Sequence, residues 1–360
     1  MDVVFGFGAI FIAAVAGGAF GLQYRVQRKY TVTNTALISL FFATIAVPLI
    51  VIHFLLPGWW DVLVDTEPRV FWLVFVLGFG WGLGAITYAF GFNLLGMALA
   101  AALIKGIAIG IGSGIPLFRR WDAPELTVGS KTLTIIGITV LLVGTWISGR
   151  AGILRERELQ GAREAPGPTP SGGGGKSVLW MGMVWCLISG VLSACANLGY
   201  EFGEPLEQKY GAMAAAGELQ QTEPYNFTLI RWMPMWWGGM AALFVCMGGA
   251  MIRDGSWRNY SKAGTARDLF VASSMGVVHF LAQYPYGVGE YFLGELGTTV
   301  GWAVNIGMAL IVAAGIGFLC GEWKGASKSS VKTILTGIFV LLGAIVLLGF
   351  AKALEAAPVG

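Results

Sequence analysis

Two ionisable side chains, Lys105 and His279, stand in the middle of long apolar stretches. The lysine interrupts "AALIKGIAIGIGSGIPL" (101–117) and the histidine interrupts "GVVHFLAQYPYGVGEY" (276–291). A lysine in apolar surroundings can bind an anionic or polyhydroxyl solute, pair with a structural acid, or extend its charge to an interface. A histidine, with an unperturbed pKa of about 6.5, can exchange protons near neutral pH or pack as a hydrogen-bonded core residue.

Acidic side chains lie near the ends of two apolar runs, one of which also holds His279. "SACANLGYEFGEPLEQ" (193–208) places Glu201 and Glu204 three residues apart, a spacing at which they could share a proton or a cation. Glu290 follows His279 near the end of its run. We expect proton coupling at Glu201, Glu290 or His279, whereas Glu204 fits an exposed helix end.

Aromatic rings and amides supply the remaining candidates for solute binding. Rings suit the apolar faces of sugars, and amides suit hydroxyl groups. Gln283 lies one helical turn after His279 and therefore on the same face. Most tryptophans, including Trp59, Trp60, Trp236 and Trp237, fit interfacial anchors instead. The predicted substrate-binding set is Trp81, Tyr88, Lys105, Asn197, His279, Gln283, Trp302 and Asn305.

The elements that must position these residues are membrane spans. Only 12% of the 360 residues are charged and 56% are hydrophobic, whereas soluble domains carry about 25% charged residues. Runs of about 20 apolar residues can cross a bilayer. Ten occur, near 3–24, 34–56, 70–92, 95–117, 131–149, 177–200, 227–250, 268–288, 297–320 and 332–351. The sequence predicts an all-α polytopic membrane protein with ten transmembrane helices.

Basic residues indicate how these spans are oriented. Of the 23 Lys and Arg residues, fifteen fall on one side of a ten-span topology, seven on the other, and Lys105 within a span. Because basic residues favour the cytoplasm, the side with fifteen lies inside, which places both termini outside an inner (cell) membrane. The first run has no basic residue before it, so we interpret it as a span and not as a secretory signal.

The two halves of the chain resemble one another. "YAFGFNLLG" (88–96) matches "YGVGEYFLG" (286–294), and "GITVLLVGTWISGRA" (137–151) matches "GIFVLLGAIVLLGFA" (337–351), at offsets of 198 and 200. We therefore predict a first five-helix repeat at 1–150, a cytoplasmic linker at 151–176 and a second repeat at 177–360. Five spans are an odd number, so the repeats are inverted, as in many secondary transporters.

Other sequence patterns do not indicate an enzyme. "SGGGGKS" (171–177) resembles a phosphate-binding loop, but Pro170 stands where that motif needs its first glycine. No catalytic, metal-binding or cofactor-binding spacing occurs, and we expect no nucleic-acid partner. Gly106, Gly110 and Gly114 lie on one helical face, which predicts a tight crossing with another helix.

Three segments resemble the bacterial L-rhamnose–proton symporters of the drug/metabolite transporter superfamily. They are "FGWGLGAITYAFGFNLLGM" (79–97), "RAGILRERE" (150–158) and "GEWKGASKSSVKTIL" (321–335). The resemblance implies ten spans in two inverted halves around a central cavity, and proton-coupled uptake of L-rhamnose or a related deoxysugar by alternating access. Two alternatives stay open: an exporter or exchanger of small anionic metabolites such as uronates or sugar phosphates, and a membrane sensor or scaffold.

Overall fold

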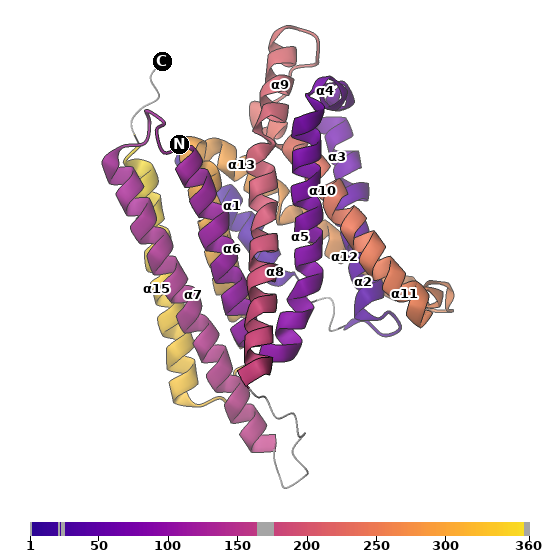
Figure 1. Cartoon of the computed structure of the whole chain (residues 1–360), viewed down its shortest axis with the longest axis vertical. Coiled ribbons are helices and arrows are strands. Elements are labelled where there is room, and N and C mark those ends of the chain that lie inside the picture. The colour runs from indigo at the N-terminus through magenta and orange to yellow at the C-terminus, as the bar shows by residue number, and fades with distance from the viewer. Residues whose placement is uncertain (1, 21, 23–25, 164–175, 356–360) are drawn as a thin grey trace. The chain divides into compact units, whose positions relative to one another are not determined.

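A computed structural model describes the chain except for residues 1, 21, 23–25, 164–175 and 356–360 (Figure 1). All regular elements of the described residues are helical, and nine stretches are long and apolar enough to cross a membrane. One of these stretches, 266–319, is 54 residues long and contains three α-helices. These findings confirm the prediction of an all-α, multi-pass membrane protein.

The helices follow one another with short connections. Their bounds are α1 Asp2–Ala19, α2 Val32–Phe41, α3 Val47–Leu55, α4 Trp59–Asp65, α5 Pro68–Leu95, α6 Met97–Arg119, α7 Val128–Arg163, α8 Lys176–Phe202, α9 Glu204–Ala215, α10 Thr228–Leu243, α11 Gly249–Asp254, α12 Ala266–Leu281, α13 Tyr284–Leu293, α14 Gly297–Leu319 and α15 Lys328–Ala353. Two π-helical turns, η2 Phe42–Ala46 and η4 Phe244–Gly248, and the 3₁₀ turns η3 Pro224–Phe227, η5 Ser256–Ser261 and η6 Gly294–Leu296 complete them. Helix α7 continues to Arg163, into the range predicted as the linker.

Contacts divide the chain into two compact units. Unit 1 comprises residues 1–83 and 195–301, and unit 2 comprises 84–194 and 302–360. Each unit therefore combines segments from both halves of the sequence. The boundaries fall inside α5 and α8 and near the start of α14.

In unit 1, helices α5 and α10 cross at paired glycines. A Cβ atom on Gly78 would overlap the carbonyl oxygen of Met235, and one on Gly238 would overlap the carbonyl oxygen of Phe75. Only glycine permits backbones to approach this closely, and such contacts hold helices together where lipid provides no hydrophobic drive.

A break between α12 and α13 is the second feature of unit 1. Helix α12 ends at Leu281, and α13 starts at Tyr284 with Pro285 in its first turn. Proline has no N–H to continue the helical ladder, which explains why the helix restarts here. Discontinuous membrane helices are typical of the solute sites of transporters.

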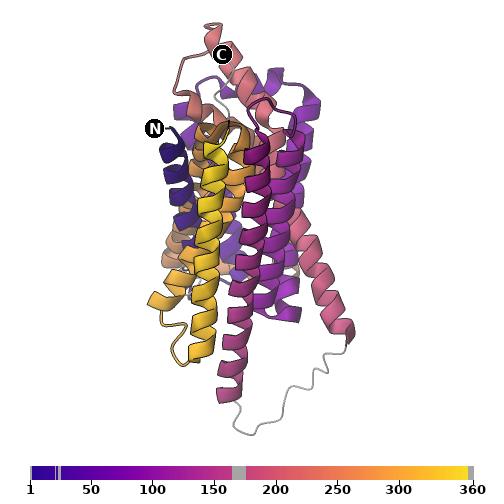
Figure 2. The same ribbon diagram turned by 90° about the vertical axis from the view of Figure 1, so that its left-hand side faces the viewer.

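Unit 2 contains an antiparallel pair formed by α7 and α15, which lie side by side in both views (Figures 1 and 2). Gly137 lies against Leu348 and Gly144 against Leu341, so one helix ascends while the other descends. The predicted tight crossing at Gly110 and Gly114 of α6 is wrong. A Cβ atom on either glycine would meet no described atom within 4 Å. The spacing of small residues along α6 therefore did not identify the face that contacts another helix.

Candidate functional site

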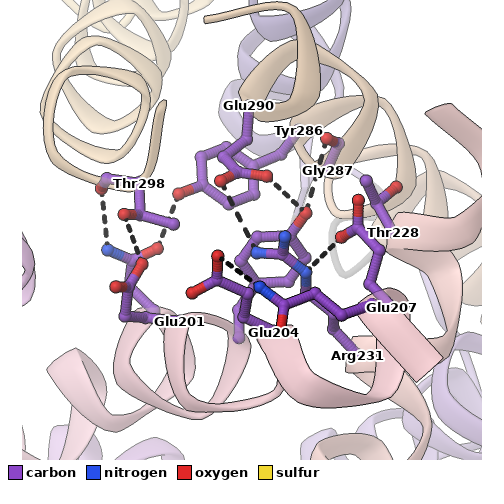
Figure 3. A network of polar contacts seen from close by, with 12 residues as sticks. Glu201, Glu204, Glu207, Thr228, Arg231, Tyr286, Gly287, Glu290 and Thr298 are labelled. Atoms are coloured by element: carbon purple, nitrogen blue, oxygen red, sulfur yellow. Dashed lines mark hydrogen bonds and ion pairs between the residues drawn. The ribbon is translucent and has the colours of Figure 1, made fainter. Parts of the chain in front are cut away.

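Four ionisable side chains from four helices of unit 1 meet in its interior (Figure 3). Glu201 comes from the end of α8, Glu207 from α9, Arg231 from α10 and Glu290 from α13. We call these four residues the carboxylate cluster. Glu201 is 0% exposed, Glu290 4% and Arg231 6%.

Arg231 supplies the positive charge of the cluster. Its Nε forms an ion pair with Glu207 Oε2, and its Nη1 lies 3.5 Å from Glu290 Oε1. The guanidinium also lies over the ring of Tyr200, 4.9 Å from the ring centroid, a cation–π contact. One cation is therefore shared between two carboxylates and an aromatic face.

Hydroxyl and amide groups surround the carboxylates. The Tyr200 hydroxyl donates to Glu290 Oε2 at 2.9 Å, and the Thr298 hydroxyl donates to Glu201 Oε2 at 2.6 Å. Asn197 accepts a hydrogen bond from the Tyr286 hydroxyl at 2.6 Å and donates to the Thr298 carbonyl oxygen at 2.9 Å. The buried amide of Asn197 thus binds within the protein.

This arrangement suits reversible proton binding. The cluster holds three carboxylates and one guanidinium, so its negative charges exceed its positive charge. A buried charged carboxylate carries a large desolvation cost, which a bound proton relieves. No group of three or more His, Cys, Asp or Glu is placed to hold a metal ion in the part of the chain that the structure describes.

A second polar group lies at the break between α12 and α13. Trp236 of α10 donates its indole N–H to Gln283 Oε1, and Gln283 Nε2 lies 3.2 Å from His279 Nε2. The imidazole also contacts two aromatic rings, Phe20 with centroids 4.7 Å apart and Trp81 with centroids 6.0 Å apart. The structure thus brings Trp81, His279 and Gln283 of the predicted set together.

Apart from Asn197, which lies in unit 1, the other predicted binding residues belong to unit 2. Trp302 donates its indole N–H to the Ala108 carbonyl oxygen at 3.0 Å, and Tyr88 packs against Phe92 with ring centroids 4.4 Å apart. Lys105 makes no ion pair within the described part of unit 2. Asn305 Oδ1 is buried and has no hydrogen-bond partner among the residues described there.

Sequence reasoning missed three residues of these sites. In the sequence analysis, Arg231 contributed only to the count of basic residues that orients the spans, and no function was predicted for Glu207. Trp236 was expected to be an interfacial anchor, which is wrong, because its side chain is 0% exposed. The signal available for Arg231 was its place four residues into an apolar run, "TLIRWMPMWWGGM" (228–240), where a basic residue needs partners.

Comparisons with known proteins agree with this picture. The sequence profile of the L-rhamnose-proton symport protein family matches residues 2–353. The chain belongs to this family. An L-rhamnose-proton symporter of Pectobacterium carotovorum subsp. carotovorum (strain PC1) is 22% identical over 352 residues, covering 95% of this chain and 96% of the relative. One of Cronobacter sakazakii (strain ATCC BAA-894) is 23% identical over 351 residues, with the same shares covered.

Membership assigns the chain to a class of transporters and not of enzymes, as the sequence predicted. A solved crystal structure with 13% identity reaches a TM-score of 0.53, with 98% of each chain covered. That likeness shows a shared fold and carries no statement about the solute. A transporter family agrees with the long apolar helices of the described residues.

Proposed function

We propose that this protein takes up L-rhamnose or a related deoxysugar together with protons, by alternating access between two inverted five-helix repeats. The observation that carries the proposal is Glu290, buried on the discontinuous span, 3.5 Å from Arg231 and bound by the Tyr200 hydroxyl. A proton on this carboxylate would alter the charge of the cluster and thereby bias the equilibrium between two conformations.

The pairing of α7 with α15 is compatible with inverted repeats. Gly137 lies against Leu348, and Gly337 lies against Ser148. Adding 200 to 137 gives 337, and subtracting 200 from 348 gives 148, an exchange that antiparallel packing produces for any offset. The support for a repeat is therefore the sequence match between residues 137–151 and 337–351, which lie in these two helices.

The helix starts follow the same offset. Ser130 N bonds Thr127 Oγ1 at 3.0 Å before α7, and Ser330 N bonds Ser327 Oγ at 3.2 Å before α15. Both are Ser/Thr caps that satisfy an otherwise free N–H group. These caps support an internal repeat, and we propose ten spans arranged as two repeats. The distribution of basic residues supports the placement of both termini outside the inner membrane.

The offset also relates two candidate solute ligands of unit 2. Helices α6 and α14 each have 23 residues and start 200 positions apart, and Lys105 in one corresponds to Asn305 in the other. Inverted-repeat transporters bind their solutes near the midplane, where equivalent spans contribute equivalent positions. A donor at Lys105 and an acceptor at Asn305 suit the hydroxyl groups of a sugar.

A second candidate function rests on Lys105, which no described carboxylate of unit 2 neutralises. A lone cation at mid-span would favour an anionic solute such as a uronate or a sugar phosphate. Thermal stabilisation of the wild type and of Lys105→Ile by neutral and acidic sugars separates the two functions. Under our proposal L-rhamnose stabilises the wild type, and the variant binds it about tenfold more weakly because one charged hydrogen bond is lost. Stabilisation by acidic sugars alone, and only with the lysine present, would favour the anion transporter.

The test of symport uses Glu290→Gln in proteoliposomes. A pH gradient of one unit corresponds to about 1.4 kcal/mol, so one proton per sugar allows roughly tenfold accumulation. We expect the variant to lose this accumulation while it still exchanges labelled for unlabelled L-rhamnose at equal concentrations. Glu218→Gln is the matched control, because Glu218 is exposed and lies on the same predicted outer side of the membrane as Glu290. This variant should accumulate L-rhamnose like the wild type.

Several outcomes would contradict the proposal. Full accumulation by Glu290→Gln would exclude this carboxylate from coupling. Wild-type protein that moves no sugar under a pH gradient or in exchange would refute sugar transport itself. Sugar binding without any flux would instead favour a sensor, and neither binding nor flux a scaffold.

A further inference from the structure

We infer that Trp236 is a positioning residue that fixes the direction of the hydrogen bonds at the helix break, so that His279 is held as the Nδ1–H tautomer. The coupling proton is thereby directed to the carboxylate cluster and away from the imidazole. The inference rests on three side chains of unit 1 and deepens the proposed function, on which its statement about coupling depends.

The direction follows from the indole of Trp236. An indole N–H can only donate a hydrogen bond, so the Gln283 atom that it meets must be the carbonyl oxygen. Trp236 is 0% exposed and stacks on Trp232, with ring centroids 5.6 Å apart and planes 11° apart. Because packing holds the indole in place, the amide of Gln283 has one favourable orientation.

The orientation of the amide determines the tautomer of the histidine. With Oε1 of Gln283 turned toward Trp236, its NH₂ group points to His279 Nε2 at 3.2 Å. An amide nitrogen donates, so Nε2 must accept and carries no proton. A neutral imidazole with an unprotonated Nε2 has its proton on Nδ1, and that is where it can donate to another group.

A second proton on Nε2 would set two donors against each other. Gln283 could relieve this conflict only by turning over, which would then set its NH₂ group against the indole N–H. Phe20, Trp81 and Gln283, which contact the imidazole, bring no charge to it. Apart from His279 itself, the acidic, basic and imidazole side chains on the described elements at and around this site are Asp2 of α1, His53 of α3, Arg69 of α5, Arg231 of α10, Arg267 and Asp268 of α12, Glu290 of α13 and Glu295 of η6.

Nitrogen NMR of the histidine side chains tests the inference without any transport measurement. The chain contains two histidines, so protein labelled with ¹⁵N-histidine in nanodiscs gives two imidazole signals, and His53→Asn assigns the remaining one. We expect Nε2 of His279 to be unprotonated and Nδ1 protonated in the wild type. The tautomer ratio should fall roughly five- to tenfold in Trp236→Phe, because one hydrogen bond is lost.

Trp232→Phe is the matched control. Trp232 is also buried on α10 and belongs to the same stack, but its N–H has no hydrogen-bond partner among the described residues. Its replacement by phenylalanine keeps an aromatic ring for Trp236 to stack on and should leave the tautomer ratio unchanged. If Trp236→Phe does not fold, Gln283→Leu removes the amide that Trp236 orients, and the tautomer ratio should fall in the same direction.

Three results would overturn the inference: a proton on Nε2 in the wild type, a Trp236→Phe spectrum equal to that of the wild type, or an equal shift in both tryptophan variants. Addition of L-rhamnose should leave the imidazole neutral, and the appearance of an imidazolium would refute the assignment of the proton. Absence of sugar flux would refute the proposed function alone, since the tautomer is read directly.

Discussion

Replacement of Arg231 by glutamine tests whether the carboxylate cluster depends on one shared cation. The variant keeps a polar side chain of similar length but removes the charge that faces Glu207 and Glu290. Two carboxylates in the interior of unit 1 then lose the guanidinium that they share. We expect this single change to destabilise the fold far more than the loss of a surface arginine.

The distance gives the magnitude. Two unit charges 3.5 Å apart attract each other by about 5 kcal/mol at an effective dielectric constant of about 20. Part of that attraction offsets the cost of burying the guanidinium, which the variant no longer bears. Removing one partner of a buried ion pair therefore costs about 3–5 kcal/mol, mainly through the charges left behind. We expect a loss on the order of 10 °C in Tm.

The assay is thermal unfolding of detergent-solubilised protein. Arg69→Gln, at the exposed start of α5, is the control and should change the free energy of unfolding by less than about 0.5 kcal/mol. In the double variant Arg231→Gln with Glu290→Gln, one of the unbalanced charges is gone, so it should be more stable than Arg231→Gln alone. A double variant as unstable as the single one, or an Arg231→Gln protein as stable as the wild type, would refute the reasoning.

Two further predictions concern how unit 1 is held together. Gly238→Ala should lower Tm strongly, because a Cβ atom there would overlap a backbone carbonyl of α5. Gly8→Ala is the control and should leave Tm unchanged, because a Cβ atom there would meet no described atom within 4 Å. Equal Tm values for the two variants would contradict the close crossing of α5 and α10. Asp268→Asn should lower the free energy of unfolding by about 1–3 kcal/mol, because the Asp268 carboxylate accepts hydrogen bonds from the backbone N–H groups of residues 28, 29 and 30. Asp122→Asn, at an exposed position, is the control and should have no effect. An unchanged Tm for Asp268→Asn would show that these hydrogen bonds do not stabilise the fold.

The sequence sufficed for the architecture because membrane insertion imposes a strong compositional signal. Long apolar runs and low charge predicted the all-helical, multi-pass class, and the segments around Trp81 and Tyr88 predicted the family. Periodicity was less informative about contacts, since lipid-facing and helix-facing positions are both apolar. The glycine stripe of α6 illustrates this, because Gly110 and Gly114 face no described neighbour while Gly238, outside any stripe we noted, makes a close crossing.

The candidate site was only partly accessible from the sequence. Glu201 and Glu290 were recognisable as acids near the ends of apolar runs, and His279 with Gln283 as a pair one turn apart. Arg231 and Glu207 were not, because their significance lies in partners from other helices that no local spacing reveals. The directing role of Trp236 likewise depends on a contact across 47 positions of sequence.

Packing around the carboxylate cluster argues that it receives a proton and not the sugar. A Cβ atom on Gly287 would lie 3.1 Å from Trp232 Nε1 and 3.2 Å from the Tyr200 hydroxyl, and one on Gly297 would lie 2.8 Å from Glu290 Cγ. A site that lacks room for one methyl group has no room for a six-carbon sugar. Under the proposed function, the proton therefore binds along α13, and the sugar binds to residues outside the carboxylate cluster, among them Lys105 and Asn305. The break between α12 and α13 is then the element through which a proton on Glu290 can change the conformation of the span and so the affinity for the sugar.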